Sequence, residues 1–178
     1  MPQVIKDMLR KPEEQIFVFM IICAGVLIAA LGLEHIGGYQ PCELCLKERY
    51  AYWAGIAIAV AASAAMSAGR SPLAAALMAV GGLALVANAG LGLYHAGIEW
   101  HWWQGPVTCT GNPNALVNNA GDLLAVLQSE NVVRCDQPAL KIAGLSLAAW
   151  NIPIGLALAA LAARSAWLLS RPGSLATP

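Results

Sequence analysis

The chain has 178 residues, of which 58% are hydrophobic and only 11% are charged, and its mean hydropathy is +0.61. Soluble domains carry about 25% charged residues. This deficit argues against a soluble protein and indicates that lipid covers part of the surface. The formal net charge is zero, which argues against nucleic-acid binding because such proteins carry clustered basic charge.

Four long apolar stretches follow one another along the chain, at residues 16–33, about 50–68, 73–96 and 142–169. Each approaches or exceeds the length of about 20 helical residues that crosses roughly 30 Å of hydrocarbon. In lipid the backbone must satisfy its own hydrogen bonds, so helices are expected. We predict an all-α integral membrane four-helix bundle, with residues 1–178 forming a single transmembrane domain. The first stretch is longer than the core of a signal peptide, so we expect an uncleaved span.

The distribution of basic residues predicts the orientation of these spans. With the N-terminus inside, six basic residues lie on inner segments and four on outer loops, a modest bias in the direction of the positive-inside rule. The inner residues are Lys6, Arg10, Lys11, Arg70, Arg164 and Arg171, and the outer ones are Lys47, Arg49, Arg134 and Lys141. Both termini are therefore expected on the inner side, with outer loops at about 34–49 and 97–141.

The second outer loop contains a stretch with helical periodicity after Asn112-Pro113. The apolar positions that recur there are Leu116, Ala120, Leu123, Leu124 and Leu127. This spacing predicts a short amphipathic helix. It can lie along the membrane surface or pack on the end of the bundle, and the sequence does not separate these alternatives.

A Pro-Cys-x-x-Cys motif, residues 41–45, directly precedes the second span. Cys42 and Cys45 can close a small disulfide or share a metal. Cys45 falls at the start of a helix, and Arg49 follows one turn later on the same face. Both effects are expected to lower the pKa of Cys45 and make it the more anionic member of the pair. Arg49 itself needs an anionic or polar partner at this depth, unless it only extends to the interface.

A second pair, Cys109 and Cys135, lies in the second outer loop with 25 residues between its members. A disulfide there would be reachable from water. Two disulfides in series suggest a relay, in which the exposed pair exchanges with a protein partner and the membrane-side pair with a lipid-soluble acceptor. The alternatives are two structural disulfides or a zinc site formed by the four loop cysteines.

Further residues in or beside the spans have candidate roles. His95 closes the third span, either as a helix-end residue or as a hydrogen-bond and proton donor at a redox site. Haem ligation by the three histidines His35, His95 and His101 is the weaker alternative. Cys23, in the middle of the first span, is expected to pack in the interior, and Asn88 and Asn151 to form hydrogen bonds between helices.

Taken in order, these motifs resemble the DsbB family, the disulfide bond formation protein B group. The resemblance rests on Pro-Cys-x-x-Cys followed by Arg49, on Tyr94-His95 at the end of the third span, on Cys109 and Cys135, and on the Gly-Leu-Ser-Leu-Ala-Ala-Trp segment at 144–150. The vitamin K epoxide reductase group has a similar architecture, but its loop cysteines precede the Cys-x-x-Cys motif.

The resemblance implies a bacterial inner-membrane thiol:quinone oxidoreductase, with cytoplasmic termini and two periplasmic loops. Its redox-active disulfides would be Cys42–Cys45 and Cys109–Cys135, and no metal would be needed. The implied cofactor is ubiquinone or menaquinone from the membrane quinone pool, near Cys45, Arg49 and His95. The implied partner is a periplasmic DsbA-like thiol oxidase, which would attack Cys109. Cys135 would then exchange with Cys42 and free Cys45 to engage the quinone.

Overall fold

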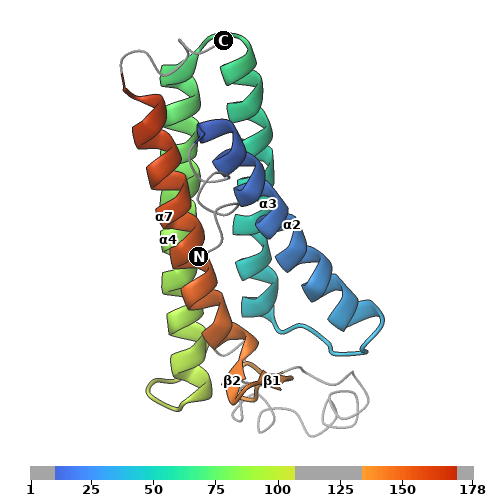
Figure 1. Cartoon of the computed structure of the whole chain (residues 1–178). Coiled ribbons are helices and arrows are strands. Elements are labelled where there is room, and N and C mark those ends of the chain that lie inside the picture. Colours follow the sequence, from blue (N-terminus) through green and yellow to red (C-terminus); the bar gives the residue numbers. More distant parts are fainter. Residues whose placement is uncertain (1–10, 107–133, 172–178) are drawn as a thin grey trace, which may run out of the picture.

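The computed structural model describes residues 11–106 and 134–171 of the chain. Four helices form a bundle: α2 (Pro12–His35), α3 (Glu43–Ser67), α4 (Ser71–Glu99) and α7 (Leu147–Leu169). Two short strands, β1 (Lys141–Ile142) and β2 (Leu145–Ser146), pair antiparallel at one end of the bundle (Figure 1). All four helices are long and apolar enough to cross a membrane. The predicted all-α four-helix bundle is therefore confirmed.

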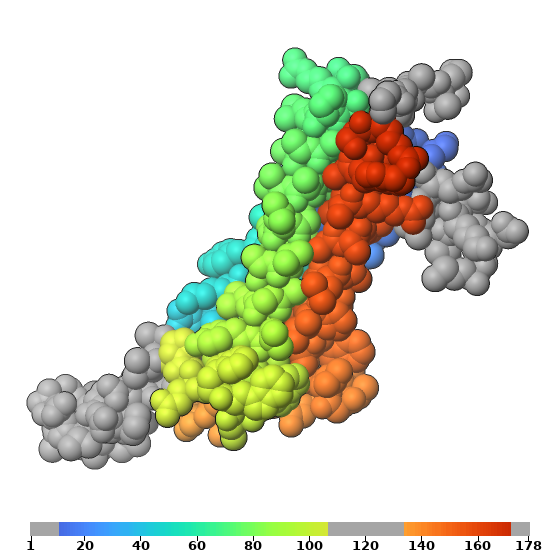
Figure 2. All heavy atoms as spheres, turned by 90° about the vertical axis from the view of Figure 1, so that its left-hand side faces the viewer, coloured from blue at the N-terminus to red at the C-terminus, as the bar shows by residue number. Residues whose placement is uncertain are grey.

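Helices α4 and α7 run side by side, as both views show (Figures 1 and 2). Small residues let their backbones approach closely. A Cβ atom on Gly82 would lie 3.4 Å from the carbonyl oxygen of Ala159, and one on Gly155 would lie 3.2 Å from that of Leu85. Such contacts are typical of helix pairs in membranes, where burial of apolar surface gives no advantage over lipid and packing must supply the attraction.

Buried polar side chains add contacts between the helices. Tyr52 of α3 and Asn88 of α4 both donate hydrogen bonds to Oδ1 of Asn151 on α7, the second over 3.2 Å. Near the other end, the hydroxyl of Ser165 donates to Gln15 of α2 over 3.0 Å. The prediction that Asn88 and Asn151 form hydrogen bonds between helices is confirmed.

The helices begin at other residues than the predicted apolar stretches. Helices α2 and α4 begin at Pro12 and Ser71 rather than at 16 and 73. Helix α3 begins at Glu43 rather than near 50, because Cys42 caps it, and the predicted position of Cys45 at a helix start with Arg49 one turn later is confirmed. Helix α7 begins at Leu147 rather than at 142, because Ser146 caps it and residues 141–146 form the β1–β2 hairpin. The two turn residues between the strands, Ala143 and Gly144, have positive φ angles of 51° and 84°, a conformation suited to a tight hairpin. The amphipathic helix predicted after Asn112-Pro113 lies outside the described residues.

The close contact between α4 and α7 generates a stability prediction. We expect Gly155→Leu to lower the free energy of unfolding by about 1–3 kcal/mol, because the added side chain meets Leu85 and Ala89 of α4. Thermal unfolding in detergent measures the change. Gly90→Leu is the matched control, since Gly90 is exposed and a Cβ there meets nothing within 4 Å. Equal unfolding temperatures for the two variants would contradict this account of the interface.

Candidate redox site at the cysteine-bearing end of the bundle

The first turn of α3 places the two cysteines of the motif side by side. Cys42 is the N-cap residue, and its sulfur accepts a hydrogen bond from the backbone N–H of Cys45 over 3.3 Å. The two Sγ atoms lie 3.0 Å apart, and both cysteines are free thiols. A disulfide bond has a length of about 2 Å, so a small side-chain rotation brings the two sulfurs to bonding distance, and closing the bond requires an acceptor for two electrons.

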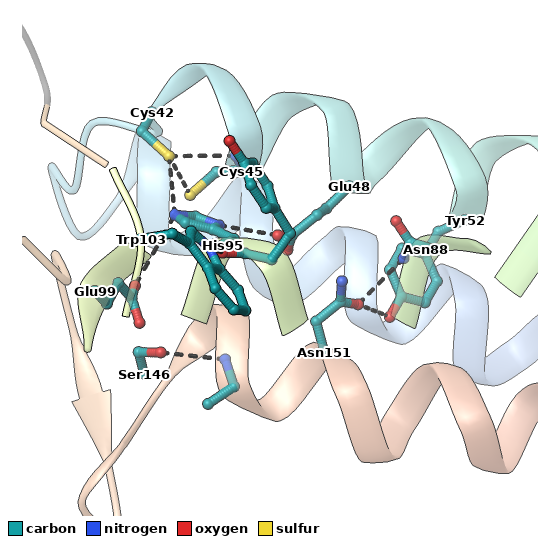
Figure 3. Close-up of polar contacts among 12 residues, drawn as sticks. Cys42, Cys45, Glu48, Tyr52, Asn88, His95, Glu99, Trp103, Ser146 and Asn151 are labelled. Carbon is teal, nitrogen blue, oxygen red and sulfur yellow. Dashed lines mark hydrogen bonds and ion pairs between the residues drawn. The ribbon is translucent and has the colours of Figure 1, made fainter. Parts of the chain in front are cut away.

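His95, in the last turns of α4, lies against this pair (Figure 3). Its Nε2 atom is 3.5 Å from the sulfur of Cys42, and its Nδ1 atom is 2.9 Å from Oε1 of Glu48 on α3. The His95 side chain is 3% exposed and that of Glu48 is 10% exposed. The site thus contains a buried series of thiol, imidazole and carboxylate.

A second carboxylate lies on the other side of the imidazole. Oε1 of Glu99, one turn after His95 on α4, is 4.0 Å from Nε2, and the side chain is 6% exposed. Its Oε2 atom is buried and has no hydrogen-bond partner among the described residues. The imidazole of His95 therefore lies close to two buried acidic groups and one thiol.

Cys135 of the second loop reaches the same point. It is disulfide-bonded and 1% exposed. Its sulfur, the sulfur of Cys42 and a ring nitrogen of His95 all lie within 4.8 Å of one another. Leu44 and Ile98 pack around these cysteines and make the surroundings apolar. Cys109 lies outside the described residues, so its pairing with Cys135 stays a prediction.

The electrostatics of the pair differ from the prediction. Hydrogen bonding from Cys45 and from His95, against the opposing effect of burial, lowers the pKa of the Cys42 thiol to about 4. The prediction that Cys45 is the more anionic member was wrong. Cys42 and not Cys45 occupies the N-cap position, where a sulfur accepts the free N–H group, and Cys42 is the cysteine that contacts His95.

Arg49 has its partners on the neighbouring helix. It forms an ion pair with Glu34 at the end of α2, and its Nη2 atom lies 3.5 Å from the carbonyl oxygen of Ala30. A buried or half-buried guanidinium group needs such a partner. The carboxylate of Glu34 is an anionic partner of the kind that the sequence predicted for Arg49.

Glu48 and Glu99 are the site residues that sequence reasoning missed. A signal for them exists: each is an acidic residue in an apolar helix, where a carboxylate must find a partner. Glu99 is also one helical turn after His95. The side chain that faces Glu48 comes from another helix, however, and only the packing of α3 against α4 reveals it.

The remaining predictions concern residues away from this site and the possibility of a metal site within it. Cys23 is fully buried near Gly55, in the main apolar core, as predicted. His35 and His101 are exposed and contact backbone carbonyl groups of their own segments. Cys42, His95 and Cys135 have donor atoms close enough to hold a metal ion, but the sulfur of Cys135 is engaged in a disulfide and offers no thiolate.

Comparison with known proteins agrees with this geometry. The chain matches the model of a family described as "Disulfide bond formation protein DsbB" over residues 12–164. The chain belongs to the DsbB family. Membership implies an oxidoreductase that acts on thiols in disulfide bond formation, as the resemblance suggested.

Two relatives share limited sequence identity with the chain. The chain is 29% identical to the disulfide bond formation protein B of Albidiferax ferrireducens (strain ATCC BAA-621 / DSM 15236 / T118) over 111 residues, which is 60% of each protein. It is 26% identical to the uncharacterized protein RP370 of Rickettsia prowazekii (strain Madrid E) over 144 residues, 79% of this chain and 80% of that protein. No solved structure gives a significant match.

The lowered pKa of Cys42 generates a prediction for its reactivity. A thiol with a pKa of about 4 is ionised at all higher pH values and becomes protonated only below that range. We expect the rate of Cys42 alkylation by iodoacetamide to be nearly constant between pH 6 and 8. Mass-spectrometric peptide mapping of the reduced full-length protein measures it. Cys42 is itself only 5% exposed, so burial slows its reaction at every pH, and the pH dependence rather than the absolute rate reports its ionisation. Cys23, which is fully buried, is the unreactive internal control. A rate that rises about tenfold per pH unit would contradict the assignment.

Proposed function

We propose that this chain is an inner-membrane thiol:quinone oxidoreductase, a single transmembrane domain that reoxidises a periplasmic DsbA-like dithiol protein. The observation that carries the proposal is the meeting of the two cysteine motifs: Cys135 and Cys42 have their sulfurs within 4.8 Å, and Cys45 is 3.0 Å from Cys42. A thiolate must contact a disulfide sulfur for exchange to occur. The described geometry supports such contact between loop and membrane-side pair.

In the exchange sequence that we propose, two electrons pass from the partner dithiol through the loop pair to Cys42 and Cys45. A thiolate of the partner attacks Cys109, and the partner's second thiolate then releases the oxidised partner and leaves Cys109 and Cys135 reduced. The thiolate of Cys135 attacks Cys42 in the Cys42–Cys45 disulfide, and Cys45 leaves with the electron pair. Attack of Cys109 on Cys135 restores the loop disulfide and releases Cys42. Two electrons and the accompanying protons then reside on the membrane-side pair.

The residues around Cys45 are compatible with a bound quinone. Cys45, Arg49 and Trp53 are spaced by four residues, so they share one face of α3. Cys45 is partly exposed there, and the Trp53 side chain is 54% exposed. A quinone is a flat apolar ring whose carbonyl oxygens accept hydrogen bonds. It would supply the two-electron acceptor, while Arg49 would donate to an oxygen and Trp53 would offer an apolar surface.

The proposed orientation places the cysteines on the periplasmic side and both termini in the cytoplasm. Described basic residues at the opposite end are Lys11, Arg70, Arg164 and Arg171. The cysteine-bearing end has the basic residues Lys47, Arg49, Arg134 and Lys141, of which the first three each form an ion pair with a nearby carboxylate. An oxidising compartment at that end suits cysteines that cycle through disulfides.

Turnover with purified components tests the function. The full-length protein in detergent is mixed with a reduced DsbA-like donor and ubiquinone or menaquinone analogues, and quinone reduction is followed by absorbance. We expect Cys45→Ser to reduce turnover to the uncatalysed rate, because the leaving sulfur is lost, and Cys23→Ser to retain it. Unchanged turnover in Cys45→Ser, or none with any quinone in the unaltered protein, would overturn the proposal in favour of a non-catalytic bundle with structural disulfides.

The exchange partner of Cys135 can be identified separately. We expect the double variant Cys45→Ser/Cys109→Ser to accumulate a Cys42–Cys135 disulfide, because these two sulfurs already lie within 4.8 Å. Non-reducing electrophoresis and peptide mapping detect it. The matched control, Cys42→Ser/Cys109→Ser, leaves Cys45 as the candidate partner and should cross-link less. A larger yield of the Cys45–Cys135 disulfide in the control than of the Cys42–Cys135 disulfide would contradict the proposed order of exchange.

A further inference from the structure

Glu48 is a carboxylate in an unfavourable place. Its side chain is 10% exposed, it lies in an apolar helix, and neighbouring apolar residues such as Leu44 are buried. Removing a carboxylate from water is unfavourable unless a partner compensates. The neighbouring Glu43 shows the contrast, because it is exposed and forms an ion pair with Lys47 one turn away. Glu48 instead points inward to His95 (Figure 3).

The contact between Glu48 and His95 determines which nitrogen faces the thiol. A carboxylate can only accept a hydrogen bond, so Nδ1 of His95 must carry a proton at 2.9 Å from Oε1 of Glu48. Nε2 then faces the sulfur of Cys42 at 3.5 Å and can take its proton. A buried acid that orients an imidazole toward a nucleophile is the general arrangement of activated cysteine and serine sites.

We propose that Glu48 is a positioning residue for disulfide exchange: it holds His95 in the orientation and protonation state that keep Cys42 as a thiolate. The inference rests on the proposed function and extends it to a residue that does not touch the exchanging sulfurs. Cys42 transfers its proton to Nε2, and the resulting imidazolium lies between the Cys42 thiolate and the Glu48 carboxylate. The Cys42 thiolate and the Glu48 carboxylate are therefore both stabilised by the His95 imidazolium.

This arrangement acts in the step that releases Cys42. When Cys109 attacks Cys135 of the Cys42–Cys135 bond, a new Cys109–Cys135 bond forms and the electron pair of the broken bond goes to Cys42. A sulfur leaves faster when its thiolate is more stable. The imidazolium 3.5 Å away stabilises that thiolate without a proton from solvent. Glu48 contributes by keeping the imidazole charged at a buried position where a lone cation is unfavourable.

Other ionisable groups also lie around His95, and the test must separate their effects from that of Glu48. Cys45 and Glu48 belong to α3, Cys42 caps it, Glu99 belongs to α4 and Cys135 comes from the second loop. Glu99 competes with Cys42 for Nε2, but at 4.0 Å it is farther away than Cys42 at 3.5 Å. Glu48 also interacts directly with Cys42 through its charge. Loss of that negative charge would by itself favour the thiolate, so an upward shift of the Cys42 midpoint reports the effect transmitted through His95, to whose Nδ1 Glu48 is hydrogen-bonded.

The pH profile of Cys42 alkylation tests the proposal without a quinone or a partner protein. In the reduced full-length chain, we expect Glu48→Gln to move the midpoint of this profile upward by about one to three pH units, the effect of removing a charge within hydrogen-bonding distance of the imidazole. Glutamine has the size of glutamate, so a role in packing alone would leave the midpoint unchanged. Glu43→Gln, on the same helix but exposed, is the matched control and should show no shift.

The outcomes separate this inference from the proposed function. An unchanged midpoint in Glu48→Gln overturns the positioning role even if quinone turnover is observed. A shifted midpoint supports it even if no quinone is reduced, in which case the proposed function fails alone. Quinone turnover should fall in Glu48→Gln and recover partly at higher pH, because a more basic medium restores the Cys42 thiolate.

A measurement on the unaltered protein covers the case in which Glu48→Gln fails to fold. Nitrogen NMR of the chain labelled at histidine reports the protonation of each ring nitrogen, with His35→Gln and His101→Gln providing the assignment. We expect Nδ1 of His95 to remain protonated throughout the pH range in which Cys42 is alkylated rapidly. A proton on Nε2 alone would overturn the proposal.

Discussion

The structure of the cysteine-bearing end of the bundle depends on the contacts of the His95 imidazole. It joins the end of α4 to the start of α3 through Glu48 and Cys42, at a place where apolar side chains exclude water. In such surroundings a carboxylate, a thiolate and an imidazolium are each unfavourable alone and are stabilised together. The ends of the two helices therefore cannot move apart without leaving buried charges unpaired, which fixes the positions of the reactive sulfurs.

The rest of the bundle delivers His95 to that place. Glycines at the contact between α4 and α7 set the distance between these helices, and the hydrogen bonds of Asn151 to Tyr52 and Asn88 fix the rotation of α3 and α4 about their axes. A residue of a helix turns by about 100° per position, so a small error in rotation would point His95 away from Cys42. The polar contacts in the membrane interior thus serve the geometry of a site closer to the bundle end.

The spans and the cysteine motifs could be predicted from the sequence, because apolar length and cysteine spacing are local properties. The start of α7 could not, since Ile142 and Leu145 of the strand pair continue the apolar run of the helix without a break that marks its start. The sequence also predicted the wrong member of the cysteine pair as the more acidic thiol. The helix terminus was recognised, but the identity of the N-cap residue and the approach of His95 depend on φ and ψ angles and on packing. Glu48 was missed for the same reason, because its partner lies 47 residues away along the chain.

The hairpin of β1 and β2 has a consequence for the loop cysteine that precedes it. Ser146 caps α7 and pairs with Lys141, and Trp150 donates a hydrogen bond to the carbonyl group of Ile142, so the hairpin is fastened to the bundle. Lys141 is six residues after Cys135 in the sequence, and this connecting segment spans at most about 20 Å when fully extended. The sulfur of Cys135 is thereby confined to a small volume above Cys42, where its effective concentration is on the order of millimolar or higher. A soluble thiol protein would have to reach such a concentration at the membrane to compete with Cys135 for Cys42.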